Sequence, residues 1–136
     1  MRAQAIAPLV PRRLLLGAIA LTAAAPAFSQ SATLDGRRFE GVFLERGKTK
    51  GDADTLTFVG GRFRSSVCDQ YGYSDAQYKA TAQGDGIAFE AETVSPKYGK
   101  LVWKGFVRGD KLDATALMVR DGKPPIENWI VAGAVK

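Results

Sequence analysis

Hydrophobic and polar residues alternate with period two through most of the chain after residue 30. Phe89 and Ala91, for example, fall on one face of their run and Glu90 on the other. Such alternation is typical of a β-strand with one buried face and one solvated face. Eight runs have this composition, at residues 37–46, 54–60, 62–69, 76–83, 86–94, 100–108, 111–120 and 126–135.

Short glycine-rich turns separate these runs. Gly60-Gly61, Gly109-Asp110 and Asp121-Gly122 are pairs of the kind that favours tight hairpins between neighbouring strands. Nothing after residue 30 keeps a helical period. The one helical turn that we predict lies near residues 74–77, with Ser74 as its N-cap.

Eight short strands joined by tight turns must hide their edges, and closure into a ring does so completely. We therefore predict an all-β fold in which an eight-stranded antiparallel up-and-down meander closes into a small barrel. A two-sheet β-sandwich is the alternative. The interior of an eight-stranded barrel is filled by side chains or holds one small ligand.

The first 29 residues predict a cleaved signal peptide, which leaves residues 30–136 as a single β-barrel domain. Arg12 and Arg13 precede the apolar run Leu14–Ala24, and small residues suitable for cleavage follow. The run is too short to span a bilayer. We expect a periplasmic or secreted protein with no membrane anchor after cleavage, exported by the general secretory route in preference to the twin-arginine route.

Removal of this segment changes the charge of the protein. The whole chain carries 19 basic and 14 acidic side chains, a net charge of +5, and three of the basic ones lie within the first 29 residues. The remaining domain is therefore nearly balanced, at +2. Since nucleic-acid binding needs a concentrated basic face, we expect no nucleic-acid partner.

The composition disfavours catalysis. The chain has no histidine, which removes the commonest general base and most zinc sites. Asp52 and Asp54, in a predicted loop, resemble a fragment of a calcium loop without the other oxygen ligands. We expect no enzymatic activity, no metal and no cofactor.

Cys68 is the only cysteine, so no disulfide can form within the chain. One interpretation is a reactive thiol whose pKa is lowered by Arg62 and Arg64; the other is a small buried residue. Continued alternation from Phe63 would point Cys68 outward, so a bulge or loop must intervene if it is buried.

Two groups of apolar residues are the candidate sites. The inward face carries aromatic side chains that either fill the barrel or line a pocket for an apolar ligand. The outward face of the last strands carries an apolar patch that suggests a protein partner or a homo-oligomer, unless a loop covers it. The candidate ligand-binding residues are Phe43, Phe58, Phe63, Tyr78, Phe89 and Trp103. The patch residues are Val102, Phe106, Leu117 and Val119, with Trp129 and Val131 as further members.

Two motifs carry family resemblances. Gly41-Val42-Phe43 resembles the Gly-x-Trp sequence that opens a lipocalin, with Phe in the place of Trp, and the layout is similar to the calycin barrels of lipocalins and avidins. Thr55–Phe58, Gly61–Phe63 and Cys68–Tyr71 resemble the pattern of META-type envelope domains. The whole chain is similar to uncharacterised bacterial periplasmic lipocalin-like proteins, which implies a small exported β-barrel.

These observations favour an exported, non-enzymatic binding module that holds a small apolar molecule in a calycin-like barrel. The alternative is a periplasmic protein-interaction or inhibitor module that acts through the outer apolar patch or a loop.

Overall fold

The computed structural model describes residues 30–136, so the predicted signal peptide, residues 1–29, lies outside the described residues. The described chain forms nine strands and one short 3₁₀-helix, η2. In chain order these are β1 (Gln30–Ser31), β2 (Arg38–Glu45), β3 (Asp52–Val59), β4 (Arg62–Ser65), η2 (Ser66–Tyr71), β5 (Ala76–Gln83), β6 (Gly86–Ser95), β7 (Gly99–Arg108), β8 (Lys111–Val119) and β9 (Ile126–Val135). Within this part of the chain, no helix has the length and apolar character needed to cross a membrane.

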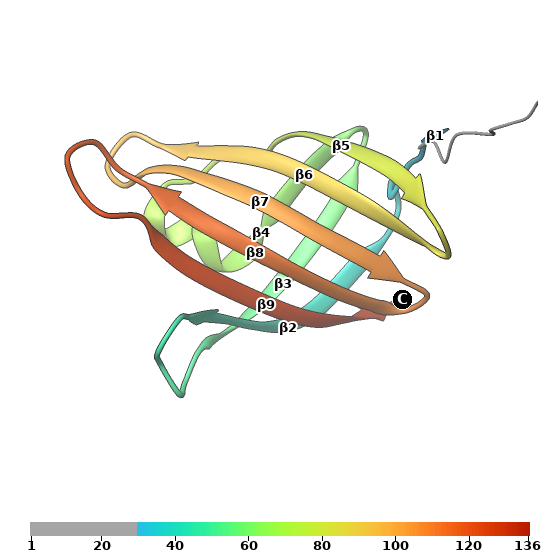
Figure 1. The fold of residues 1–136 in the computed structure, drawn as a ribbon, viewed down its shortest axis with the longest axis horizontal. Coiled ribbons are helices and arrows are strands. Elements are labelled where there is room, and N and C mark those ends of the chain that lie inside the picture. Colours follow the sequence, from blue (N-terminus) through green and yellow to red (C-terminus); the bar gives the residue numbers. More distant parts are fainter. Residues whose placement is uncertain (1–29) are drawn as a thin grey trace, which may run out of the picture.

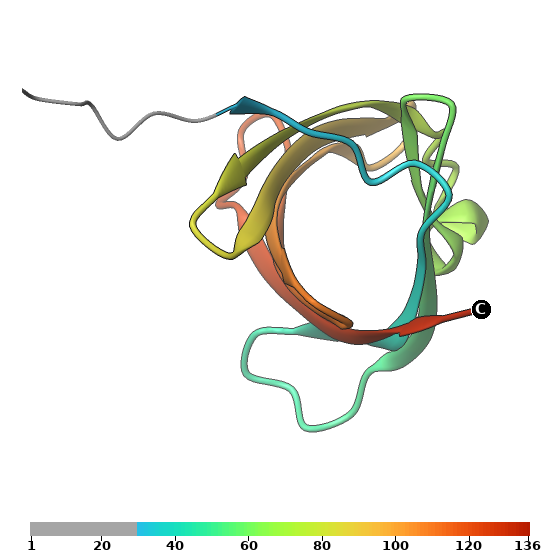
Figure 2. The ribbon, with the colours of Figure 1, turned by 90° about the vertical axis from the view of Figure 1, so that its right-hand side faces the viewer.

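Strands β2 to β9 form a closed antiparallel barrel in which every strand pairs with its neighbours in the sequence. The ring closes because β9 returns beside β2, from Arg38 opposite Val135 to Glu45 opposite Asn128. Figure 1 shows the barrel from the side, and Figure 2 shows the ring from one end. This confirms the predicted eight-stranded up-and-down barrel over the β-sandwich. The two-residue strand β1 is an addition that pairs with β5.

The prediction is wrong between residues 66 and 77. The strand predicted at 62–69 ends at Ser65, and helix η2 follows it; the helical turn predicted at 74–77 is absent, because Ser74 and Asp75 are not helical and Ala76 and Gln77 begin β5, the strand predicted at 76–83. Asp54 causes the change, and it lies in strand β3 and not in the predicted loop. Its carboxylate accepts hydrogen bonds from Ser65 Oγ at 2.6 Å, Ser66 Oγ at 3.2 Å and the Val67 backbone N–H at 3.0 Å.

A cluster of aromatic rings fills the middle of the barrel. The Phe58 ring packs against four others, those of Phe39, Phe63, Tyr78 and Phe89, with centroid distances between 5.0 and 6.1 Å. Burial of each such ring contributes roughly 1.5–3 kcal/mol. Gly105 makes room for the cluster, since a Cβ there would lie 2.5 Å from the Phe89 ring.

The N-terminal segment runs along the rim of the barrel at the end that carries the turns at residues 60–61, 84–85 and 109–110 (Figure 2). Leu34 is fully buried there. Its backbone N–H donates to Tyr78 Oη at 2.8 Å, and Tyr78 Oη donates in turn to Asp35 Oδ1 at 2.7 Å. The Gly36 N–H donates to the Phe58 carbonyl oxygen at 2.7 Å. These bonds hold Leu34 as an apolar plug.

The plug predicts a large effect of a single truncation. Leu34→Ala should lower the free energy of unfolding by about 2–5 kcal/mol, because it removes fully buried methyl groups and leaves a cavity. Urea denaturation measures the change. Val59→Ala is the matched control: the Val59 side chain is 67% exposed, so the expected change is within about 0.5 kcal/mol. Equal stability of the two variants would show that Leu34 is not a plug.

Candidate functional site

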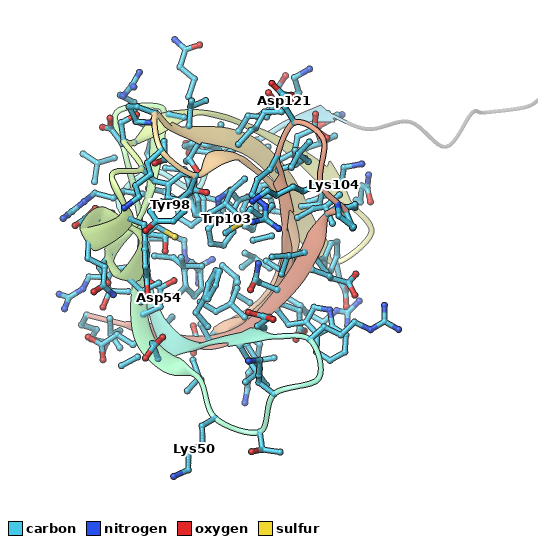
Figure 3. The ribbon with its side chains drawn as sticks, turned by 90° about the vertical axis from the view of Figure 1, so that its left-hand side faces the viewer. Lys50, Asp54, Tyr98, Trp103, Lys104 and Asp121 are labelled. Atoms are coloured by element: carbon cyan, nitrogen blue, oxygen red, sulfur yellow. The ribbon has the colours of Figure 1, made fainter. Side chains whose placement is uncertain are left out.

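The opposite end of the barrel carries the longer connections and holds a pocket. Four loops surround this mouth, at residues 46–51, 66–75, 96–98 and 120–125. Between them lies a cavity of about 440 Å³, a size within the usual range of small-molecule sites. Figure 3 looks into this end, with Tyr98 and Trp103 inside the ring of strands. We call this cavity the mouth pocket.

The wall of the mouth pocket is apolar and aromatic. Strands β2, β7 and β8 contribute inward side chains, and the loops contribute tyrosines. The tyrosines brace one another: the Tyr71 and Tyr98 rings meet edge to face at 5.6 Å, and Tyr73 Oη donates to the Tyr98 carbonyl oxygen at 3.4 Å. Ser95 Oγ donates to the Tyr71 carbonyl oxygen at 2.7 Å, which ties η2 to the β6–β7 turn. The wall residues are Phe43, Val67, Tyr71, Tyr73, Tyr98, Leu101 and Met118.

Charged groups stand around this apolar wall. Glu45, Lys48 and Asp52 border the pocket from the 46–51 loop and its flanking strand ends, as does Lys50, whose side chain points away from the barrel in Figure 3. Arg120 borders it from the end of β8. The Nε atom of Arg120 is buried and has no hydrogen-bond partner among residues 30–136. No group of three or more His, Cys, Asp or Glu side chains in the same residues could hold a metal ion.

Cys68 lies on η2 at the base of the pocket and is buried. Burial raises the pKa of its thiol to about 11, and the negative charges of Asp54 and Asp69 act in the same direction. Ser65 Oγ, 3.4 Å from the sulfur, opposes them. Arg62 and Arg64 do not activate the thiol, because they pair with Asp75 and Asp69. The structure therefore favours the buried, unreactive interpretation, with η2 as the intervening turn.

The six candidate ligand-binding residues do not form one cavity. Phe58, Phe63, Phe89 and Trp103 are buried in the aromatic cluster, where the Phe63 and Trp103 rings lie 4.9 Å apart. Tyr78 lies at the plugged end. Of the six, only Phe43 borders the mouth pocket, half-buried and 5.8 Å from the Trp103 ring.

Three residues of the candidate outer patch, Val102, Leu117 and Val119, adjoin one another on β7 and β8, whereas the exposed Lys104–Thr115 pair separates them from Phe106. Val102 lies opposite Leu117 in the strand register; Leu117 and Val119 are exposed, whereas Val102 and Phe106 are half-buried. A hollow of about 520 Å³ beside it is lined by Phe106, Trp129 and Val131 among others. A third, shallow hollow on β5 to β7 is bordered mainly by charged and polar side chains such as Lys79 and Glu90.

Sequence reasoning missed most of the mouth pocket. Tyr71, Tyr73 and Tyr98 fall between the predicted strands, and Arg120 ends one of them. A signal was available, because alternate connections of a meander lie at the same end of a barrel. The connections after the third and fifth predicted strands contain all three tyrosines.

Comparisons with known proteins found no similarity to report. A scan against protein-family models, a search of curated proteins and a search of solved structures each gave no match. The classification of this chain therefore rests on its fold alone, a closed eight-stranded antiparallel barrel.

The raised pKa of Cys68 predicts slow alkylation. The thiolate is the reactive form, so the rate with iodoacetamide should rise about tenfold per pH unit from about pH 8 to pH 10 without levelling off. Mass spectrometry of timed samples measures it. The protein unfolded in guanidinium is the control, and its rate should level off near pH 9, the ordinary value for cysteine. A folded-state plateau at the same pH would contradict the burial of the thiol.

Proposed function

We propose that this chain is an exported, non-enzymatic binding module that holds a small, largely apolar ligand in the mouth pocket of its barrel. The observation that carries the proposal is the difference between the two ends. One end is plugged by Leu34, and the middle is filled by the aromatic cluster. The other end keeps a cavity of about 440 Å³ with an apolar wall.

The chemistry of the wall suits such a ligand. Leu101 and Met118 offer aliphatic contacts, and Phe43 and the tyrosines offer ring faces and edges. Asn128 is buried beneath them and donates to the Ala116 carbonyl oxygen at 3.1 Å, which fixes its amide at the pocket. A mostly apolar pocket with a few fixed polar groups is the usual form of a small-molecule site.

Export, the lack of catalysis and the calycin resemblance belong to the same proposal. Export rests on residues 1–29, and the lack of catalysis rests on the absence of histidine from the sequence. The resemblance of Gly41-Val42-Phe43 to the lipocalin opening is supported by the closed antiparallel barrel, which is the fold it implies.

Binding of a neutral apolar probe tests the site. N-phenylnaphthylamine should bind wild-type protein saturably at one site, with enhanced probe fluorescence. Met118→Trp should weaken binding about tenfold or more, because the larger side chain occupies the mouth pocket. The control is Leu117→Trp, the same substitution on the neighbouring, outward-facing residue of β8, which should bind as wild type does. Saturable binding that neither variant changes would show that the mouth pocket is not the site, and either that result or a lack of saturable binding would overturn the proposal.

A second candidate function is self-association through the outer face, and the hollow beside Trp129 favours it. Two large apolar side chains are exposed there, Trp129 at 44% and Val131 at 64%. Exposed apolar side chains that gather in one patch are typical of an interaction surface. Lys104 and Asp113 border the same hollow with opposite charges and form no ion pair within the described residues. A two-fold axis through the hollow would place both charges on each side of the interface, an arrangement in which Lys104 of one chain can pair with Asp113 of the other.

Self-association predicts a mass that depends on concentration. In sedimentation equilibrium, wild-type protein should pass from monomer to dimer as concentration rises, and Trp129→Ser should remain monomeric over the same range. Val94→Ser, which removes an exposed apolar side chain away from the hollow, should dimerise as wild type does. A wild-type monomer at every concentration would exclude this function.

A further inference from the structure

Arg120 is the unusual residue of the mouth pocket. It follows β8 directly, and its side chain turns back over the β6–β7 turn. It passes beside Gly99, since a Cβ on Gly99 would lie in van der Waals contact, 3.4 Å, with Arg120 Cγ. The positive charge of Arg120 also reaches Tyr73, since it opposes the rise in the pKa of that phenol that burial causes. The guanidinium therefore belongs to the wall of the pocket and not to the outer surface.

The guanidinium has an unused donor. Arg120 Nε is the one buried side-chain nitrogen or oxygen atom in residues 30–136 without a hydrogen-bond partner. Arg120 also takes no part in the seven ion pairs of these residues. A buried donor without an acceptor is destabilising, and a charged one more so, which is why almost all such groups are paired in native structures.

The other charges of the mouth do not cancel this one. Glu45 and Asp52 are exposed, as are Lys48 and Lys50, so solvent screens all four and their charges balance. Arg120 is only half exposed and gives the lining residues a surplus of one positive charge, while the buried Asp54 carboxylate near Cys68 is occupied by three hydrogen bonds. Nε itself is covered by protein atoms, so an oxyanion in the pocket meets the terminal nitrogens of the guanidinium, which can donate two parallel hydrogen bonds to a carboxylate.

We infer that the ligand of the mouth pocket is an amphipathic organic anion, whose oxyanion is bound by Arg120 while its apolar body lies against Met118 and the tyrosines. This inference rests on the proposed function and adds the chemical class of the ligand. The site takes an aromatic or aliphatic acid in preference to an uncharged molecule of the same shape.

Two probes that differ in one group test the inference. Anilinonaphthalene sulfonate and N-phenylnaphthylamine share the same ring system, and only the first carries an oxyanion. Wild-type protein should bind the sulfonate about tenfold or more tightly than the neutral probe, as expected for a charge-assisted hydrogen bond away from bulk water. Arg120→Gln should abolish that preference, so that the two probes bind the variant with affinities within about twofold of each other. Arg120→Lys should retain part of the preference, because lysine keeps the positive charge but lacks the two parallel N–H donors of the guanidinium.

The controls separate the possible failures. Lys123→Gln removes an exposed charge from the same connection outside the pocket lining and should leave the preference unchanged. On wild-type protein alone, added salt should weaken binding of the sulfonate more than that of the neutral probe. If the neutral probe binds in a manner sensitive to Met118→Trp but the sulfonate binds no better, the inference is wrong and the proposed function stands. If neither probe responds to Met118→Trp, the proposed function is wrong.

Discussion

The carboxylate of Asp54 is the constraint on which the shape of the barrel's mouth depends. It is 2% exposed and accepts three hydrogen bonds from the segment that begins η2. Because these bonds turn the chain at Ser65, β4 has only four residues and pairs with β5 at two positions. At the other end, β4 begins only after the Gly60–Gly61 turn, so the edge of β5 beyond Gln77 is free of β4, and β1 pairs there, opposite Thr81 and Ala82. The chain that leaves β1 then reaches the plugged end, while η2 carries Tyr71 and Tyr73 to the mouth.

The filled middle and the open mouth together decide what kind of site the barrel can offer. Rings that meet at 4.9–6.1 Å leave no space for a ligand between Phe58 and Trp103, and a domain of this length needs that burial for its stability. The pocket lies above this rigid floor, with walls from loops. Phe43 joins the two, since it borders the pocket and packs against the Trp103 ring. Loops positioned by a packed scaffold are a common setting for binding residues.

The barrel could be predicted from the sequence wherever one face of a strand is buried. Residues 76–83 were predicted with the observed bounds because alternation marks them, and residues 126–135 because a run of strand-like composition follows Pro124-Pro125. The end of β4 could not, since it depends on contacts between Asp54 and residues 11 to 13 positions away. Strand β1 could not be predicted either, because two residues are too few to show an alternating pattern of apolar and polar side chains. The aromatic residues were rightly assigned to the inside, but alternation does not distinguish a ring in the packed middle from one at the mouth.

Cys68 borders the mouth pocket, and Ser65 Oγ contacts both its sulfur and the Asp54 carboxylate. A lone cysteine beside a ligand site in an oxidising compartment, where the proposed export would place it, is at risk of forming a disulfide with another chain. The same turn that Asp54 imposes puts the sulfur inside the barrel wall, where burial raises the pKa of the thiol to about 11. Since thiol–disulfide exchange proceeds through the thiolate, the raised pKa suppresses exchange near neutral pH. The hydrogen bonds that shape the mouth therefore also keep the one cysteine protonated beneath it.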